Sequence, residues 1–313
     1  MNAQERRPRK FPGHFYWKPD EQMSKPVEAP VNVACVQFEP RFGDLAHNRD
    51  RATELIRRAH AQGADLIVLP ELVSSGYVFE SREEAYELSE AGTDGPFLKA
   101  LSTAAAELKV HVVAGYCERS AEKLFNSAVL VGPHGVIGNY RKSHLWGAEA
   151  LFFERGDLGF PVWTTRLGRI GIIICYDGWF PEAWRLCALQ GADIVCVPTN
   201  WVPMPEQPTN QMAMANILCM AAAHSNSMFV AAASRTGVER GQPFIGQSVI
   251  AAHTGWLAAG PASHEDEEII AAACNLSDAR RKRTLNEFNQ VMRDRRKDVY
   301  GEMLGASAIP NWY

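Results

Sequence analysis

The sequence lacks the features that direct a chain into or across a membrane. No apolar run approaches the roughly 20 residues that a membrane-spanning helix needs. The basic N-terminal stretch is followed by no apolar segment of the signal-peptide type. The formal charge is only −4 with both signs interspersed, so there is no electrostatic basis for binding nucleic acid or an anionic membrane. We therefore expect a soluble cytoplasmic protein with neither a membrane nor a nucleic-acid partner.

Paired cysteines and metal-ligand motifs are also missing. The seven cysteines are scattered, odd in number and without a C-x-x-C pair, which is typical of free thiols in a reducing cytosol. No cluster such as H-E-x-x-H is present, so the sequence predicts no metal site. Most of the cysteines are expected to be small buried hydrophobic residues, namely Cys35, Cys187, Cys196, Cys219 and Cys274.

What the sequence does contain is an internal repeat. Strand, helix and strand are predicted in "VNVACVQFEP", "NRDRATELIRRAHAQ" and "GADLIVLPE", and again in "RIGIIICYDG", "PEAWRLCALQ" and "GADIVCVPT". In both halves an Ala-rich helix, another strand and a hairpin with a glycine turn follow. Apolar strands that alternate with helices predict sheets covered by helices, here an α/β fold in the form of a four-layer α-β-β-α sandwich with a pseudo-two-fold repeat.

The repeat also predicts the domain organisation. No linker-like change in composition separates its halves, so we expect one domain over residues 31–275. Residues 1–30 are expected to form an irregular arm whose aromatic stretch "FPGHFYW" packs on the body or on a partner subunit. Residues 276–313 are expected to form a charged helix and tail that contribute packing or oligomer contacts.

Polar residues follow four of the predicted strands at the point where each strand ends. Glu71 follows "DLIVLP", Lys142 follows "GVIGNYR", Cys175 follows "RIGIII" and Asn200 follows "DIVCVPT". Ligands of open α/β sheets gather at the carboxyl ends of strands, so we expect these side chains to converge. Taken singly, the cysteine, the lysine and the glutamate are more simply explained as a buried thiol, a surface charge and a turn cap.

A carboxylate, an amine and a thiol at one sheet edge are suited to acyl transfer. A thiol with a pKa of about 8.5 is only partly ionised at neutral pH, so it needs a base or a nearby cation. Glu71 would take the thiol proton from Cys175 and later activate water. Lys142 would stay protonated and stabilise the tetrahedral oxyanion, together with the backbone N–H of Tyr176.

Three segments in this order resemble the signature segments of the carbon–nitrogen hydrolase (nitrilase) superfamily: "LPELVSSGY", "YRKSHLW" and "IIICYDGWFPE". The resemblance implies the sandwich fold, a Glu71–Lys142–Cys175 triad, and no cofactor or metal. Family members carry a second glutamate after the lysine, and "GAEALFFERGD" implies that Glu149 has this place and orients Lys142 and the nucleophile. The family also implies a homodimer or a higher homo-oligomer, assembled across the helical face that follows the cysteine.

The residues after the cysteine indicate a branch of that family. Nitrilases usually have Trp and Glu there, whereas Tyr176 and Asp177 are similar to the amidase and carbamoyl-amide branches. Arginines that hold a substrate carboxylate in some carbamoyl hydrolases have no counterpart in "DGWFPE". The resemblance therefore implies hydrolysis of a primary amide, or of a carbamoyl amide, through a thioester on Cys175 with release of ammonia.

Four residues on loops just after the predicted strand ends are candidate substrate contacts, namely Tyr77, Trp146, Asn200 and Trp201. Aromatic residues in such loops serve packing as often as recognition, so the two interpretations of each stay open.

The sequence is also compatible with other functions, to different degrees. A nitrilase would use the same triad to make an acid and ammonia from a nitrile. A Cys–His hydrolase using His144 or His224 is less favoured, because the sequence indicates no histidine oriented by an Asn or Asp. A catalytically silent scaffold is disfavoured by the intact triad, and an N-acyltransferase of the superfamily by the lack of membrane spans.

Overall fold

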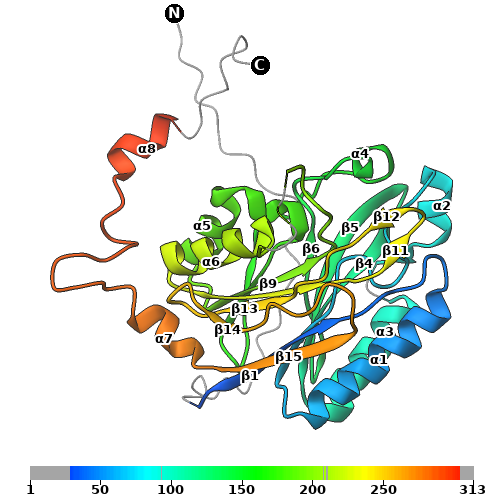
Figure 1. Cartoon of the computed structure of the whole chain (residues 1–313), viewed down its shortest axis with the longest axis horizontal. Helices are drawn as coiled ribbons and strands as arrows, with labels where there is room; N and C mark the ends of the chain where they lie inside the picture. Colours follow the sequence, from blue (N-terminus) through cyan, green and yellow to red (C-terminus); the bar gives the residue numbers. More distant parts are fainter. Residues whose placement is uncertain (1–28, 93, 207, 209–210, 304–313) are drawn as a thin grey trace, which may run out of the picture.

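Two β-sheets lie face to face at the centre of the computed structural model, with helices α1 and α3 outside one sheet and α5 and α6 outside the other (Figure 1). The structure describes residues 29–92, 94–206, 208 and 211–303. This arrangement confirms the predicted α-β-β-α sandwich. The expected aromatic arm, residues 1–30, lies outside the described residues except for its last two positions.

The first half of the repeat forms one sheet and its two covering helices. Its elements are β1 (Val31–Gln37), α1 (Leu45–Ala61), β2 (Leu66–Val68), α2 (Arg82–Glu87), β3 (Glu90–Ala91), α3 (Pro96–Leu108), β4 (His111–Ser120), β5 (Lys123–Gly132) and β6 (Gly135–Arg141). The strand order is β15-β1-β2-β4-β5-β6, with β3 paired to β4. Strands β1, β2 and β4 are parallel, and β5 and β6 add an antiparallel hairpin.

The second half repeats this plan. Its elements are α4 (Glu149–Phe152), β7 (Val162–Thr164), β8 (Arg169–Ile172), the 3-10 helix η1 (Cys175–Trp179), α5 (Pro181–Leu189), β9 (Ile194–Thr199), α6 (Met214–Asn226), β10 (Phe229–Ser234), β11 (Val238–Glu239), β12 (Gln242–Pro243), β13 (Val249–Ala251), β14 (Leu257–Ala259) and β15 (Glu268–Cys274). The strand order is β14-β13-β10-β9-β8-β7. Here β8, β9 and β10 are parallel and β13–β14 is the hairpin, so the predicted repeat is confirmed.

The Gly-Ala-Asp motif of each half has a physical reason in the turn between helix and strand. Gly63 and Gly191 have φ of +93° and +87°, which residues with a Cβ rarely adopt. Asp65 and Asp193 each accept a hydrogen bond from a backbone N–H at the start of the neighbouring strand, β1 or β8, at 3.0 and 2.8 Å. The motif therefore ends a helix and aligns two parallel strands.

The apolar core occupies two interfaces of the sandwich. One cluster lies between the two sheets and continues under α5 and α6, and a second fills the space between the first sheet and α1 and α3. The five cysteines expected to be buried belong to this interior, and all seven cysteines are free. Within the described part of the chain, no helix is both long enough and apolar enough to span a membrane.

The C-terminal segment, expected as a charged helix and tail, is helical only in part. It forms two short helices, α7 (Leu276–Arg281) and α8 (Lys297–Met303), joined by a largely irregular stretch that leaves the body of the molecule (Figure 1). The Asn286 side chain accepts hydrogen bonds from the backbone N–H groups of Phe288 and Asn289, each at 2.9 Å. Such local bonds compete with helical ones, which accounts for the irregular stretch between α7 and α8.

Candidate active site

The strand ends bring the four predicted residues to one rim of the sandwich. Glu71 lies shortly after β2, Lys142 directly after β6, Asn200 directly after β9, and Cys175 begins η1 just beyond β8. Strand β6 is antiparallel to β5, which is itself antiparallel to β4, so β6 ends at the same rim as β2 and β4. The convergence expected from the repeat is therefore present.

A buried ion-pair cluster centred on Lys142 lies at this rim. Its Nζ atom is 2.7 Å from Oε1 of Glu71 and 2.6 Å from Oε1 of Glu149. The side chain of Lys142 is 0% exposed, and those of the two glutamates are 0% and 5% exposed. One cation thus compensates two carboxylates away from water, an arrangement that is costly to assemble and strongly destabilised by removal of a single member.

Glu71 has one occupied oxygen and one free oxygen. Its Oε1 atom accepts hydrogen bonds from Lys142 and from Nδ2 of Asn126, both at 2.7 Å. Its Oε2 atom is buried and has no hydrogen-bond partner among the described residues. Burial raises the pKa of Glu71 to about 7, although Lys142 acts in the opposite direction. A carboxylate with a free lone pair and a pKa near neutrality is suited to take up and return a proton.

Lys142 remains a cation in this setting. Burial by itself would lower the pKa of its amine, but the neighbouring Glu149 and Glu71 outweigh that effect and hold the pKa above its ordinary value. The ammonium group is thus a permanent hydrogen-bond donor with a fixed direction. It cannot serve as a base near neutral pH, so a proton acceptor in this cluster has to be a carboxylate.

Glu149 is held at the start of α4 by its neighbours. Its Oε1 atom accepts a hydrogen bond from the Tyr77 hydroxyl at 2.6 Å, in addition to the ion pair with Lys142. Its Oε2 atom accepts the backbone N–H of Trp146 at 3.2 Å. Burial, followed by Glu149 itself, raises the pKa of the Tyr77 phenol, so the phenol stays protonated and keeps donating.

Cys175 occupies a conformation that few residues with a Cβ adopt. Its φ is +44°, and it is 8% exposed at the head of η1. Burial, followed by the charge of Glu71, raises the pKa of its thiol, whereas Lys142 and the adjacent Thr199 act to lower it. The resting group is therefore a thiol that needs a base when it reacts. Tyr176 is next in η1, where a helix leaves backbone N–H groups without internal partners.

Asp177 has surroundings that the sequence did not indicate. Its carboxylate is 0% exposed and accepts hydrogen bonds on both oxygens. Oδ2 accepts from the backbone N–H of Ile174 at 3.0 Å and from the Tyr140 hydroxyl at 2.7 Å. Oδ1 accepts from the backbone N–H and the Nδ1 atom of His144, at 2.9 and 2.7 Å. No spacing rule would have paired Asp177 with two residues more than 30 positions earlier.

The same contacts correct an expectation about histidine. The sequence suggested that no histidine is oriented by a carboxylate, but Asp177 does orient His144. The imidazole also stacks on Phe180, with ring centroids 3.7 Å apart. His224, the other candidate, donates from Nδ1 to the carbonyl of Thr254 at 2.9 Å, on the exposed side of α6.

The four candidate substrate contacts have different surroundings. Tyr77 and Trp146 both contact Glu149, as described above, and Trp146 packs edge-on against Tyr176 with centroids 4.9 Å apart. Asn200 donates to the backbone carbonyl of Glu71 at 2.9 Å, a contact that supports the loop carrying Glu71. Trp201 lines a small apolar cavity of about 10 Å³ beside Cys175, together with Trp179, Trp184, Val197, Leu218 and Cys219.

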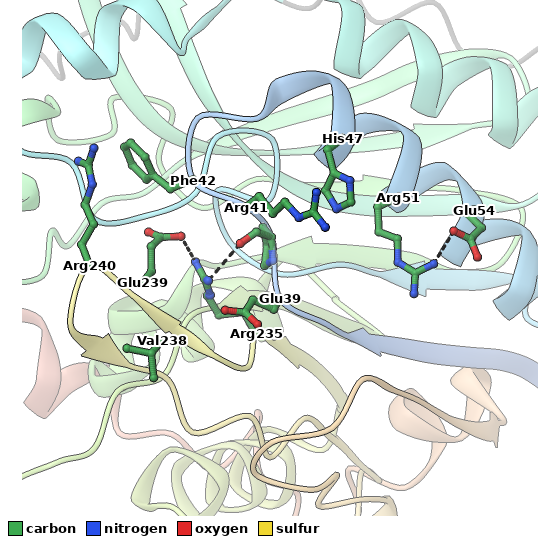
Figure 2. A pocket seen from close by; sticks show the side chains of 11 residues that line it. Glu39, Arg41, Phe42, His47, Arg51, Glu54, Arg235, Val238, Glu239 and Arg240 are labelled. Carbon is green, nitrogen blue, oxygen red and sulfur yellow. Dashed lines mark hydrogen bonds and ion pairs between the residues drawn. The ribbon is translucent and has the colours of Figure 1, made fainter.

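A larger polar groove of about 810 Å³ lies along the loop before α1 and the β11–β12 hairpin (Figure 2). Its arginines are largely engaged: Arg235 pairs with Glu239, and Arg51 pairs with Glu54. Oε1 of Glu239 accepts the backbone N–H of Tyr77 at 2.7 Å, so the groove borders the loop that carries Tyr77. The triad residues are not among those that line it.

Known proteins are similar to this chain over most of its length. A family model described as carbon-nitrogen hydrolase matches residues 32–284. A protein of Pyrococcus abyssi described as a nitrilase is 42% identical over 270 residues, which cover 86% of this chain and 99% of that protein. N-carbamoylputrescine amidase of Solanum tuberosum is 32% identical over 289 residues, which cover 88% and 95% of the two chains.

A solved structure is also similar. It is a variant of the amidase from Nesterenkonia sp. AN1 showing covalent addition of the acetamide moiety of fluoroacetamide at the active site cysteine. Its TM-score to this structure is 0.72 at 25% sequence identity, over 88% of this chain and 98% of that chain.

Proposed function

The chain belongs to the carbon–nitrogen hydrolase family, whose members hydrolyse C–N bonds, and we propose that this member hydrolyses primary amides through a thioester on Cys175. The observation that carries the proposal is the buried cluster beside the thiol. In it, Lys142 holds Glu71 and Glu149 at 2.7 and 2.6 Å, while the Oε2 atom of Glu71 keeps a free lone pair. A thiol, a base and a fixed cation are the parts that acyl transfer requires.

In the first step the Cys175 sulfur attacks the amide carbonyl while its proton passes to Glu71. The free oxygen of Glu71 is the acceptor, since Oε1 is already occupied by Lys142 and Asn126. The tetrahedral intermediate then breaks its C–N bond, the proton held by Glu71 passes to the leaving nitrogen, and ammonia departs. The acyl group is left as a thioester on Cys175.

The negative charge that develops on the carbonyl oxygen needs fixed donors. Lys142 supplies a permanent positive charge, and the backbone N–H of Tyr176, at the start of η1, supplies a second donor. Glu149 contributes indirectly, because its Oε1 atom, 2.6 Å from Nζ of Lys142, helps to fix the ammonium. Tyr77 in turn fixes Glu149.

In the second step water replaces ammonia. Glu71, again a carboxylate, takes a proton from a water molecule while the oxygen of that water attacks the thioester carbonyl. The C–S bond breaks, the proton returns to the sulfur of Cys175, and a carboxylic acid is released. The two steps together convert an amide and water into an acid and ammonia, and they restore the resting site.

Substrate selection is proposed from the surroundings of Cys175. The side chains beside the thiol are apolar, which favours an uncharged substrate, although the cavity of about 10 Å³ is smaller than an acyl group. Among the similar proteins, one binds an acetamide moiety at its cysteine and another is named an amidase of a carbamoyl compound. A nitrile substrate is the second candidate, because the Pyrococcus abyssi relative at 42% identity is described as a nitrilase.

We also propose that copies of the chain associate through the outer face of α5 and α6. Large apolar side chains there are about half exposed, at 44 to 48%, namely Leu186, Leu189, Met214 and Ile217. A cluster of this kind on a helical face is typical of a protein interface. Sedimentation velocity of the full chain measures the oligomer, and a strictly monomeric species at micromolar concentration contradicts this proposal.

The function is tested by an ammonia-release screen over aliphatic, aromatic, ω-amino and N-carbamoyl amides, with matched nitriles alongside. We expect turnover of neutral amides and an acyl adduct on Cys175 in mass spectra. Cys175→Ala should show neither turnover nor adduct, and its melting temperature should equal that of the wild type. Turnover of nitriles alone would establish the second candidate. Release of ammonia by Cys175→Ala at the wild-type rate would overturn the mechanism.

A further inference from the structure

Among the described residues, Asp177 receives hydrogen bonds only from those that border the catalytic side chains. Two of the donors, Tyr140 and His144, stand two positions before and two positions after Lys142. The third, Ile174, directly precedes Cys175. One buried carboxylate thus connects the segment of the lysine to the segment of the nucleophile, although 33 positions separate Cys175 from Lys142 in the chain.

The bonds to Ile174 also close a small ring around the nucleophile. The Asp177 carboxylate accepts the backbone N–H of Ile174 at 3.0 Å, and the Asp177 backbone N–H donates to the Ile174 carbonyl at 3.0 Å. Both backbone polar groups of Ile174 are therefore engaged by a single residue. Only Cys175 and Tyr176 lie between these anchors, so the direction of the thiol depends on them.

The backbone of Cys175 needs such support. Its φ of +44° is unfavourable for a residue with a Cβ, and strained conformations of this kind persist only where the surroundings hold them. On the lysine side, burial and the Asp177 charge raise the pKa of the Tyr140 phenol, so it remains a donor. His144 is further restrained by its stacking on Phe180 at 3.7 Å.

We propose that Asp177 is a positioning residue that sets the Cys175 thiol against the Lys142 ammonium. This inference rests on the proposed function, because the thiol and the ammonium are the groups that it positions. Asp177 does not act as an acid or base itself, since both of its oxygens are taken up by donors. Its neighbour Tyr176 faces aromatic rings instead, including Trp146 at 4.9 Å.

Asp177→Asn is the informative substitution because it preserves size and removes one acceptor. In one orientation its amide nitrogen faces the Ile174 N–H, and in the other it faces the His144 N–H, so two donors always oppose each other. Asp193→Asn is a matched control. Asp193 is also 0% exposed and accepts a backbone N–H, from Arg169 at 2.8 Å, but it lies before β9, at the strand end opposite to the rim.

Each variant is measured by kcat and KM on the best amide, by the rate of iodoacetamide alkylation mapped to Cys175, and by thermal melting. In Asp177→Asn we expect kcat and the alkylation rate to fall together by about 10- to 100-fold, with KM changed by less than about threefold, because a misplacement of about 1 Å has an effect of this size. In Asp193→Asn we expect a lower melting temperature with both rates within about twofold of wild type.

Wild-type alkylation and wild-type kcat in folded Asp177→Asn would overturn the inference, as would equal losses in the two variants. Should Asp177→Asn fail to fold, Tyr140→Phe removes a single donor: an alkylation rate about threefold lower supports the inference, and an unchanged rate overturns it. Alkylation is independent of turnover. If the wild-type protein releases no ammonia from any amide, the proposed function is rejected. A lower rate of Cys175 alkylation in Asp177→Asn would still support the positioning role in that case.

Discussion

Glu71 and Asp177 are both completely buried carboxylates beside the catalytic loops, and they differ in how their oxygens are occupied. Asp177 is saturated by four hydrogen bonds from three residues. Glu71 has two bonds on one oxygen and none among the described residues on the other, and burial raises its pKa to about 7. The saturated group is suited to fix structure, and the group with a free lone pair is suited to move a proton.

The largest expected effect comes from removing the cation of the Glu71 cluster. Lys142→Met keeps the length of the side chain but leaves Glu71 and Glu149 buried without their partner. We expect kcat to fall by about 1000-fold or more, since a key oxyanion donor is lost, and the free energy of unfolding to fall by about 3–5 kcal/mol. Steady-state kinetics and urea unfolding measure the two effects.

The neighbouring Arg141 offers a matched control. It pairs with Glu118 at 2.6 Å and with Asp157 at 2.9 Å, away from the Lys142 cluster. Arg141→Met should lower stability while kcat stays within about threefold of wild type. Equal catalytic losses in the two variants would mean that the lysine acts only through the fold.

An intermediate effect is expected from Glu71→Gln, which removes the base but retains the shape. We expect a fall in kcat of about 100- to 1000-fold. In the wild type kcat/KM should rise with pH through about 7, because only the ionised Glu71 accepts the thiol proton. A pH–rate profile that is flat between pH 5 and 8 would argue against Glu71 as the base.

The stability contributed by Glu71 should change with pH in the sense opposite to that of kcat/KM. The folded state raises the pKa of Glu71 to about 7 from an ordinary 4.5, so folding favours the protonated form. Its contribution to stability is complete below about 4.5 and is lost as the pH rises through 7. The difference in unfolding free energy between wild type and Glu71→Gln should therefore decline over this window.

The smallest effect is expected in the Asp177 cluster, from His144→Ala. The substitution removes the ring that donates to Asp177, while the backbone N–H of residue 144 still donates. We expect kcat to fall by about three- to tenfold. A fall in kcat as large as that of Lys142→Met would instead identify His144 as the base of a Cys–His pair. The contact between His144 and Asp177 is the reason to test that mechanism.

Much of the fold could be predicted from local sequence patterns. Apolar strands, helical periodicity and the paired Gly-Ala-Asp motifs predicted the repeat, and the structure confirms it because Gly63 and Gly191 supply the same positive φ. The positions of Glu71, Lys142 and Cys175 at strand ends were predicted for the same reason. The irregular stretch between α7 and α8 could not be predicted, because the charge pattern did not reveal how Asn286 bonds to the backbone.

The sequence by itself determined which residues stand at the strand ends, since turn chemistry and apolar periodicity act over a few neighbouring positions. Only the tertiary structure decided which lone pairs remain free. Glu71 receives Asn126 and Lys142 on one oxygen, and Asp177 receives Tyr140 and His144, all from distant parts of the chain. Hydrogen-bond saturation depends on such partners, so the division between a proton acceptor and a positioning group is a property of the fold.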